Sequence, residues 1–257
     1  MNNSSIRLDG KKILITGASR PLGIGATLAK RFAEAGAAVA VHGYSAYDLT
    51  VGERNSATPD GTENLAKQFQ DSGLNVTLVT PSDFEKHGTA KKAVEEAAEK
   101  LGGLDGLILN HCYGTTVKID QWTEEAIDSH LSVNVRAAMM MIKSFSNIVD
   151  TTKDNAITTF SSGQYHQIET DLMAYSVSKD AIICLTRGTA KLLGEKNIRV
   201  NCINPGPNDT GWYSGDTSYW CTPNDAADLV LFLHSSYAKC ITGQVIASDK
   251  GESVGAW

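Results

Sequence analysis

The stretch that decides the fold is KILITGASRPLGIGATLAKRFAEAG, residues 12–36. It starts with a short apolar run at residues 12–15, continues through a glycine-rich turn at residues 16–25 and ends in an apolar-periodic run at residues 26–36. A strand, a glycine-rich turn and a helix in this order are typical of proteins that hold the pyrophosphate of a dinucleotide. An ordinary loop of the same composition is the alternative, so the rest of the chain must decide.

Along the chain, short apolar runs alternate with amphipathic segments. The expected strands are Lys12–Thr16, Ala38–His42, Asn75–Val79, Asp105–Asn110, Asn155–Phe160, Ile198–Ile203 and Gln244–Ala247. The expected helices are Ile24–Ala35, Glu63–Asp71, Glu85–Lys100, Thr123–Val149, Ala174–Gly194 and Asn224–His234. This alternation predicts an α/β fold with helical crossovers between parallel strands. We therefore expect a single doubly wound, Rossmann-type parallel sheet of about seven strands, with helices on both faces, in one domain over residues 1–257.

The composition excludes several classes of partner. A net charge of −6 over 257 residues argues against nucleic acid or an anionic membrane surface, because both need clustered Lys and Arg. No window approaches the ~18 consecutive apolar residues of a membrane helix, and residues 1–12 lack the apolar core of a secretory signal, so a cytoplasmic location is expected. The five cysteines include no C-x-x-C pair, which predicts no metal site, no disulfides, and reduced thiols acting as small buried hydrophobes.

The glycines of the loop have separate expected roles. Gly17 allows the tight turn after the strand, Gly23 lets the backbone approach a phosphate, and Gly25 lets the helix pack closely on the sheet. The helix that opens at Ile24 would offer free N–H groups and a positive dipole end to the pyrophosphate. Pro21 lies inside the turn, so it stiffens the loop without removing a critical donor.

The choice of cofactor is expected at the end of the second strand, where proteins that prefer NAD place a carboxylate on the ribose hydroxyls. Gly43 occupies that place here, so nothing repels a 2′-phosphate. Ser19 and Arg20 are placed to bind such a phosphate, Arg20 through a charge-assisted contact. NADP(H) is therefore favoured and NAD(H) remains possible. An exposed surface charge is the alternative interpretation of Arg20.

A second constellation lies in the second half of the chain. Tyr175 and Lys179 are four residues apart on an expected helix, so their side chains share one face. Ser162 follows the strand AITTFSS, and Asn134 lies on the preceding long helix. Taken alone, Asn134 is typical of a polar helix residue and Ser162 of a strand cap. A phenol beside a cation, with a hydroxyl donor close by, suits proton transfer to a developing alkoxide.

These motifs together resemble the short-chain dehydrogenase/reductase family. The opening LDGKKILITGASR…GIG is similar to its T-G-x-x-x-G-x-G fingerprint, lengthened by PL, and Asn134, Ser162, Tyr175 and Lys179 match its active-site set. INPGPNDT and ITGQVIASDKG resemble later family motifs, so the resemblance spans nearly the whole chain. It implies that Tyr175 is the proton donor, that Lys179 also holds the nicotinamide ribose, and that Asn134 anchors a water. The expected cofactor-binding residues are Gly17, Ser19, Arg20, Gly23, Ile24, Gly25, Asp83, Asn110, Tyr175, Lys179, Pro205, Gly206 and Thr210.

Two features depart from the family pattern. The usual N-N-A-G after the fourth strand is NHCY at residues 110–113, so His111 is either an extra proton donor or a packed pocket residue. Only twelve residues separate Thr210 from Pro223, which predicts a short substrate lid near residues 207–222 and an open pocket. The expected substrate-pocket residues are Tyr113, Gln164, Trp212 and Tyr213. Together with Tyr219 and Trp220, the aromatic residues of this segment form either a substrate platform or oligomer contacts.

The resemblance implies an NADPH-dependent carbonyl reductase, most similar to the 3-oxoacyl-carrier-protein reductases, with 3-oxoacyl thioesters as candidate substrates. The alternative is an NADP(H)-binding redox sensor or scaffold without turnover. Enoyl reduction is disfavoured, because family members with that activity place their Tyr seven residues before the Lys, where Leu172 stands here. We also expect a homo-oligomer, tetramer or dimer, formed through the helices of Asn134 and Tyr175, since residues 137–145 are apolar on more than one face.

Overall fold

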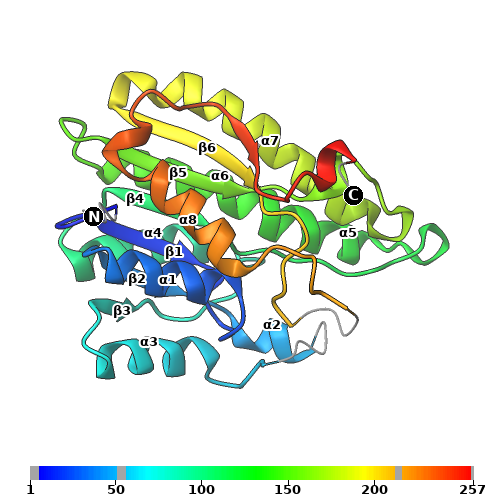
Figure 1. Ribbon diagram of the computed structural model, residues 1–257. Helices are drawn as coiled ribbons and strands as arrows, with labels where there is room; N and C mark the ends of the chain where they lie inside the picture. The colour runs from blue at the N-terminus through cyan, green and yellow to red at the C-terminus, as the bar shows by residue number, and fades with distance from the viewer. Residues whose placement is uncertain (1–5, 51–55, 212–215, 256–257) are drawn as a thin grey trace.

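The computed structural model describes residues 6–50, 56–211 and 216–255. In these residues seven strands form one sheet in the order β3-β2-β1-β4-β5-β6-β7, and every pairing is parallel (Figure 1). The strands are β1 Lys12–Thr16, β2 Ala38–His42, β3 Val76–Leu78, β4 Gly106–Leu109, β5 Asn155–Phe160, β6 Ile198–Asn204 and β7 Val245–Ala247. The predicted Rossmann-type sheet is confirmed.

Helices cover both faces of the sheet (Figure 1). One face packs against α1 Ile24–Glu34, α3 Gly61–Asp71 and α8 Pro223–Leu233. The other packs against α4 Thr89–Leu101, α6 Ala137–Ile148 and α7 Met173–Leu193. Because both faces are covered, β4, β5 and β6 are buried along their whole length, although β5 and β6 each carry polar side chains.

The register brings the site loops together. Thr16 of β1 lies opposite His42 of β2 and Leu109 of β4, so these strands end level. Phe160 of β5 likewise lies opposite Ile203 of β6. Loops that follow parallel strands therefore meet at one edge of the sheet, where doubly wound proteins hold their ligands.

Three helical features differ from the expectations. The helix expected at 123–149 consists of α5 Glu124–His130, a π-helical segment η2 at Leu131–Arg136, and α6. The helix expected from Glu85 starts at Thr89, because Gly88 takes a left-handed conformation with φ 86°. An additional helix, α2 Ser45–Thr50, follows β2. Six short 3-10 turns complete the described elements, at Ile119–Gln121, Gly163–Tyr165, Thr170–Leu172, Gly194–Lys196, Ser236–Ala238 and Glu252–Val254.

The cysteines only partly follow the expectation of buried hydrophobes. Cys202 and Cys221 are buried and Cys112 is half-buried, but Cys184 and Cys240 are exposed. All five are free thiols. Cys184 lies on the side of α7 that the sheet does not cover, so its side chain is exposed although the helix is amphipathic.

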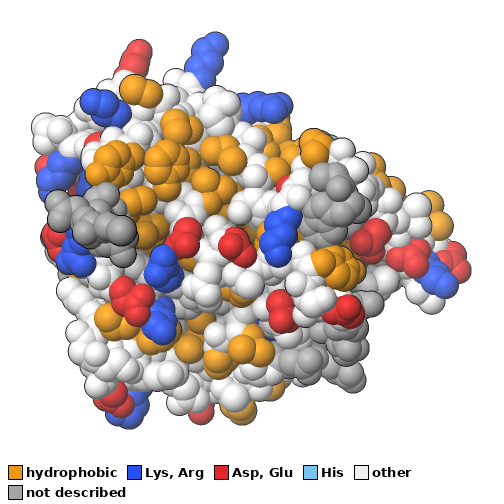
Figure 2. Space-filling model, in the orientation of Figure 1, with side chains coloured by type: hydrophobic (Ala, Val, Ile, Leu, Met, Phe, Trp, Pro, Cys, Tyr) orange, Lys and Arg blue, Asp and Glu red, His pale blue; other side chains and the backbone are white. Residues whose placement is uncertain are grey.

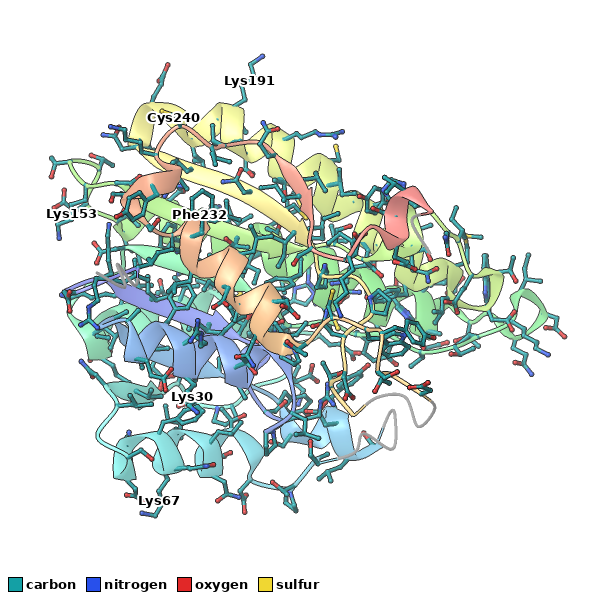
Figure 3. The ribbon with its side chains drawn as sticks, viewed as in Figure 1. Lys30, Lys67, Lys153, Lys191, Phe232 and Cys240 are labelled. Carbon is teal, nitrogen blue, oxygen red and sulfur yellow. The ribbon has the colours of Figure 1, made fainter. Side chains whose placement is uncertain are left out.

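The surface carries mixed charge. On the face shown in Figure 2, basic and acidic side chains are interspersed between apolar areas. In Figure 3, Lys67, Lys153 and Lys191 project beyond the outline of the ribbon, and Lys30 is exposed on α1. Among the described helices, none is long and apolar enough to cross a membrane.

Candidate active site

A cleft of about 1770 Å³ opens at the carboxyl edge of the sheet. Its walls come from the segments that follow all seven strands of the described sheet, and from α7. It brings together most of the residues expected from the sequence: Gly17, Ser19, Arg20, Gly23, Ile24, Asp83, Asn110, Tyr113, Ser162, Gln164, Tyr175, Lys179, Pro205, Gly206 and Thr210. Trp212 and Tyr213, expected in the substrate pocket, lie outside the described residues.

The glycine loop forms a tight cradle at one end of this cleft. Gly17 has φ 75°, and a Cβ there would lie 2.8 Å from both the Asn110 side-chain nitrogen and the His111 backbone nitrogen. A Cβ on Gly25 would overlap the Gly17 carbonyl oxygen, so Gly25 does not line the cleft but lets α1 approach β1. Asn110 fixes the cradle, because its Nδ2 donates to the carbonyl oxygens of Thr16, at 3.2 Å, and Gly17, at 3.0 Å.

The first turn of α1 is open to an anion. Gly23 caps the helix without a side-chain hydrogen bond, and the first turn carries no acidic residue. The Gly23 N–H donates to the Arg20 carbonyl oxygen at 3.0 Å, but the N–H groups of the first turn that follows and the positive end of the helix dipole face the cleft where Gly23 and Ile24 line it. This donor set fits the pyrophosphate of a dinucleotide.

Ser19 and Arg20, the two residues expected to bind the 2′-phosphate of the cofactor, both contact the Asp48 carboxylate. Ser19 Oγ donates to Asp48 Oδ2, and Arg20 Nε lies 3.6 Å from Asp48 Oδ1. Arg20 also donates from Nη1 to the Thr210 carbonyl oxygen at 3.0 Å. Asp48 belongs to α2 and is 7% exposed, so this carboxylate is a fixed part of the cleft wall.

Packing explains why no acid follows β2 directly. A Cβ on Gly43 would overlap Thr62 Oγ1 and lie 3.0 Å from the Ser19 Cβ. A larger side chain at residue 43 is therefore excluded by its neighbours. The carboxylate that is missing at residue 43 is supplied by Asp48, five residues further along the chain.

The helix α7 positions the reactive pair. Tyr175 and Lys179 lie one turn apart on its cleft side, and Lys179 Nζ is 5.6 Å from the centre of the Tyr175 ring. The buried Lys179 ammonium donates to the Phe160 carbonyl oxygen at 3.0 Å, which ties it to the last residue of β5. Ser162, two residues beyond Phe160, lines the same cleft. The arrangement places a phenol, a cation and a hydroxyl around one space.

Asn134 lies behind this wall rather than in the cleft. Its Oδ1 accepts from the Tyr113 backbone N–H at 2.7 Å, and its Nδ2 donates to the Tyr113 carbonyl at 2.9 Å and to Ser178 Oγ at 2.8 Å. The amide thus joins the loop after β4 to α7, from within the π-helical segment. A second cavity of about 10 Å³, roughly the room for one water, is lined by Asn134, His111 and Lys179.

His111 is a packed residue. Its Nδ1 lies 2.7 Å from Thr16 Oγ1 and its Nε2 lies 3.2 Å from the Val133 carbonyl oxygen. Burial, with the nearby His42 and Lys179, lowers its pKa to about 3. The ring is therefore neutral near pH 7 and links β1 to the π-helical segment, which argues against a role as proton donor.

Comparison with known proteins identifies the relationship. A family model described as "Enoyl-(Acyl carrier protein) reductase" matches residues 17–253. "Dehydrogenase/reductase SDR family member 4" of Sus scrofa is 30% identical over 95% of this chain and 88% of that protein. The chain belongs to the short-chain dehydrogenase/reductase family.

Solved structures of the family share the whole fold. A short-chain dehydrogenase from Burkholderia cenocepacia J2315 in complex with NADP is 29% identical, with a TM-score of 0.81 over 94% of this chain and 97% of that one. The landomycin C-6 ketoreductase LanV, with bound NADP and rabelomycin, is 28% identical, with a TM-score of 0.82 over 97% and 98% of the two chains. Like its short-chain dehydrogenase/reductase relatives, this protein is an NAD(P)-dependent oxidoreductase.

Several cleft residues of this short-chain dehydrogenase/reductase were not predicted from the sequence. Besides Asp48, they include Tyr47 of α2 and Glu252, which follows β7. Tyr47 accepts from the Gly114 backbone N–H at 2.8 Å and donates to its carbonyl at 3.1 Å, so α2 is fastened to the loop after β4. For Tyr47 and Asp48, the signal in the sequence was the long segment between the expected strand that ends at His42 and the expected helix that starts at Glu63, whereas no pattern pointed to Glu252.

Proposed function

We propose that this short-chain dehydrogenase/reductase is an NADPH-dependent carbonyl reductase that converts a ketone to a secondary alcohol. The observation that carries this proposal is the opening of Ser162, Tyr175 and Lys179 into the same cleft as the glycine cradle. When bound, the nicotinamide cofactor supplies the hydride. The protein's own residues then have to orient the carbonyl group and deliver a proton to its oxygen.

Each residue has a distinct part in that proton transfer. Ser162 donates a hydrogen bond to the carbonyl oxygen and stabilises the charge that forms on it. Tyr175 donates its phenolic proton to the same oxygen, and the Lys179 ammonium stabilises the phenolate left behind. Asn134 positions α7 and the loop after β4 through Tyr113 and Ser178. The small cavity beside Lys179 supports a water-mediated return of the proton.

The cofactor proposal concerns Ser19, Arg20 and Asp48. The hydroxyl and the guanidinium favour a 2′-phosphate, but the Asp48 carboxylate competes with it for both groups. We therefore propose NADP(H) as the cofactor, bound less tightly than in a cleft without Asp48, with NAD(H) as the second candidate. Gly206 and Thr210 complete the expected nicotinamide end.

The remaining expectations from the sequence are proposals of the same kind. We propose a cytoplasmic, single-domain homo-oligomer, tetramer or dimer, with a short lid near residues 207–222 and a small-molecule carbonyl substrate. Tyr219 and Trp220 line the cleft, which supports the substrate platform over a purely oligomeric role. The exposed Met139 and Met140 on α6 support an oligomer contact on that helix. Reduction of 3-oxoacyl thioesters belongs in the substrate panel.

Two other functions are tested by the same panel. Enoyl reduction agrees with the description of the matched family model, but Tyr175 lies four residues before Lys179, and Leu172 occupies the position seven before it. A redox sensor or scaffold would bind NADP(H) without turnover, and the joint presence of Ser162, Tyr175 and Lys179 in the cleft argues against it.

The test is NADPH consumption over ketones, diketones, 3-oxoacyl thioesters and enoyl thioesters. We expect turnover of a ketone that falls by about 10² or more in Tyr175→Phe, since that substitution removes the proton donor. The matched control is Tyr237→Phe, at a phenol that is 70% exposed and outside the cleft, with unchanged turnover expected. NADPH binding without any turnover would replace the reductase by the sensor or scaffold.

A further inference from the structure

The end of the cleft beyond Ser162 is acidic in its described lining residues, and Lys250, which is not one of them, donates from Nζ to the carbonyl oxygens of Tyr219 and Trp220. This end is lined by residues 163–164, 167–169 and 172, by Tyr219 and Trp220, and by Glu252. We call it the substrate end. Its charged side chains are Glu169 and Glu252, whereas the cations among the described cleft residues are Arg20 and Lys179. Both cations already face other groups, namely Asp48 and the Phe160 carbonyl oxygen.

The backbone of Glu252 is held firmly. The buried Asp249 carboxylate accepts from the backbone N–H groups of Gly251, at 2.9 Å, and Ser253, at 3.1 Å. The Glu252 N–H itself donates to the Asp249 carbonyl oxygen at 3.1 Å. A Cβ on Gly206 would overlap Asp249, so this turn is packed against the loop that follows β6. These hydrogen bonds and this packing therefore fix the position of Glu252 at the cleft.

The Glu252 carboxylate faces the residues that follow β5. Its Oε2 lies 3.3 Å from where a Cβ on Gly163 would be, and Gly163 directly follows Ser162. The side chain is half-buried and makes no hydrogen bond or ion pair with a residue in the described part of the chain. Burial and the charge of Asp249 raise its pKa, while His166 lowers it. Glu169 differs, because its Oε1 accepts from Gln164 Nε2 at 3.1 Å.

A half-buried carboxylate without a partner is stabilised by a ligand that brings a positive charge, and it repels an anion. We propose that Glu252 makes the cleft selective for carbonyl substrates with a positively charged amino group near the carbonyl, over anionic ones. This inference rests on the proposed carbonyl reductase function and narrows it. It disfavours substrates that place a carboxylate or phosphate at the substrate end.

The experiment uses three methyl ketones of equal length whose far ends are a trimethylammonium, a tert-butyl and a carboxylate group. We measure kcat/KM with NADPH for the wild-type protein and for Glu252→Gln. The ratio of cationic to anionic ketone is expected to fall about tenfold in Glu252→Gln, because one nearby charge is removed, while the neutral ketone changes by less than about twofold. Glu195→Gln, which removes an exposed carboxylate outside the cleft, is the matched control and keeps the ratio.

Dissociation constants of the three ketones from the protein–NADP⁺ complex are measured in parallel, because they do not need turnover. If Tyr175 is needed to reduce the neutral ketone, but Glu252→Gln leaves the ratio of cationic to anionic ketone unchanged, the charge selection by Glu252 is overturned and the carbonyl reductase function is retained. If no ketone is reduced, but Glu252→Gln still lowers the affinity for the cationic ketone relative to the anionic one, the carbonyl reductase function is overturned and a cation-selective pocket is supported. An unchanged ratio in both measurements overturns the inference on Glu252.

Discussion

At the scale of single residues, Asp48 changes how the cofactor end works. A 2′-phosphate gains the hydroxyl of Ser19 and the guanidinium of Arg20 only by competing with a carboxylate that already faces both. Asp48 thus opposes the phosphate through like charge and through occupation of its donors. This residue, rather than the glycine at the end of β2, is expected to set the preference between the two nicotinamide cofactors.

Replacing Asp48 by Asn tests this role. The amide keeps the size of the side chain and still accepts from Ser19, but it removes the negative charge near the phosphate. We expect the Kd for NADPH to fall about fivefold or more and the Kd for NADH to change by less than about twofold. Fluorescence titration of both cofactors measures it, with Asp60→Asn, an exposed carboxylate at the start of α3, as the control. Weaker NADPH binding in Asp48→Asn would contradict the competition.

Single positions also show what the sequence could predict of the site. The predicted cleft residues were those at fixed offsets from strand ends and motifs, such as Gly17, Tyr175 and Lys179. Asp48 and Glu252 were missed, because each enters the cleft from a turn or short helix whose path no periodicity encodes. Gly43 was interpreted as a missing carboxylate, whereas the packing of Thr62 and Ser19 against it requires a glycine.

At the scale of elements, the sheet and its covering helices were predictable and the breaks in them were not. The alternation of short apolar runs with amphipathic segments indicated all seven strands of the described sheet. The segment from 123 to 149 keeps a helical pattern throughout, so nothing in its periodicity marked the π-helical turn at η2. That turn depends on tertiary contacts, since Asn134 inside it bonds the backbone of Tyr113 on another segment.

The contact between α1 and β1 gives a prediction at this scale. Gly25→Ala places a methyl group against the Gly17 carbonyl, so α1 must shift and the cradle must open. We expect loss of NADPH binding by at least about tenfold and a lower free energy of unfolding by about 1–3 kcal/mol. Gly188→Ala is the matched control in α7, where a Cβ meets no atom within 4 Å. It is expected to leave binding unchanged and to raise the free energy of unfolding by up to about 1 kcal/mol.

Cofactor titration and urea unfolding of the two glycine variants separate the explanations. Equal effects of both substitutions would mean that helix propensity, rather than the close approach of α1 to Gly17, controls the result. Intact NADPH binding in Gly25→Ala would show that the loop tolerates a shifted helix.

At the scale of the whole molecule, four histidines whose pKa values are lowered by burial couple folding to pH: His42, His111, His130 and His234. Burial lowers the pKa of His42 to about 4 and the pKa values of His111 and His234 to about 3. For His234, the neighbouring charges of Arg199 and Lys11 lower it further. His42, His130 and His234 are buried, and His111 is half-buried between the cleft and the π-helical segment. Protonating any of them in the folded protein therefore requires an uncompensated buried charge.

The sign of the effect follows from the two states. Each histidine has a lower pKa in the folded protein than the ordinary 6.5, so below pH 6.5 the unfolded chain binds protons that the folded protein does not. The stabilising contribution is fully present above pH 6.5 and is lost progressively as the pH falls towards 4. Each residue contributes a slope of at most about 1.4 kcal/mol per pH unit, and the three with the largest shifts together contribute about 4 kcal/mol per pH unit. Between pH 6.5 and 4 the loss is roughly 10 kcal/mol, which is comparable to the whole stability of a domain, about 5–15 kcal/mol, so a large loss of stability is expected by pH 4.

Urea unfolding between pH 5 and 7.5 measures this slope. His234→Gln is expected to reduce the slope below pH 6.5 by about a quarter to a third, whatever its effect on stability at pH 7.5, because one of the four histidine contributions disappears. His87→Gln, at an exposed position on the turn before α4, is the control and leaves the slope unchanged. A slope that does not respond to His234→Gln would assign the acid sensitivity to carboxylates instead, since their protonation also destabilises folded proteins at lower pH.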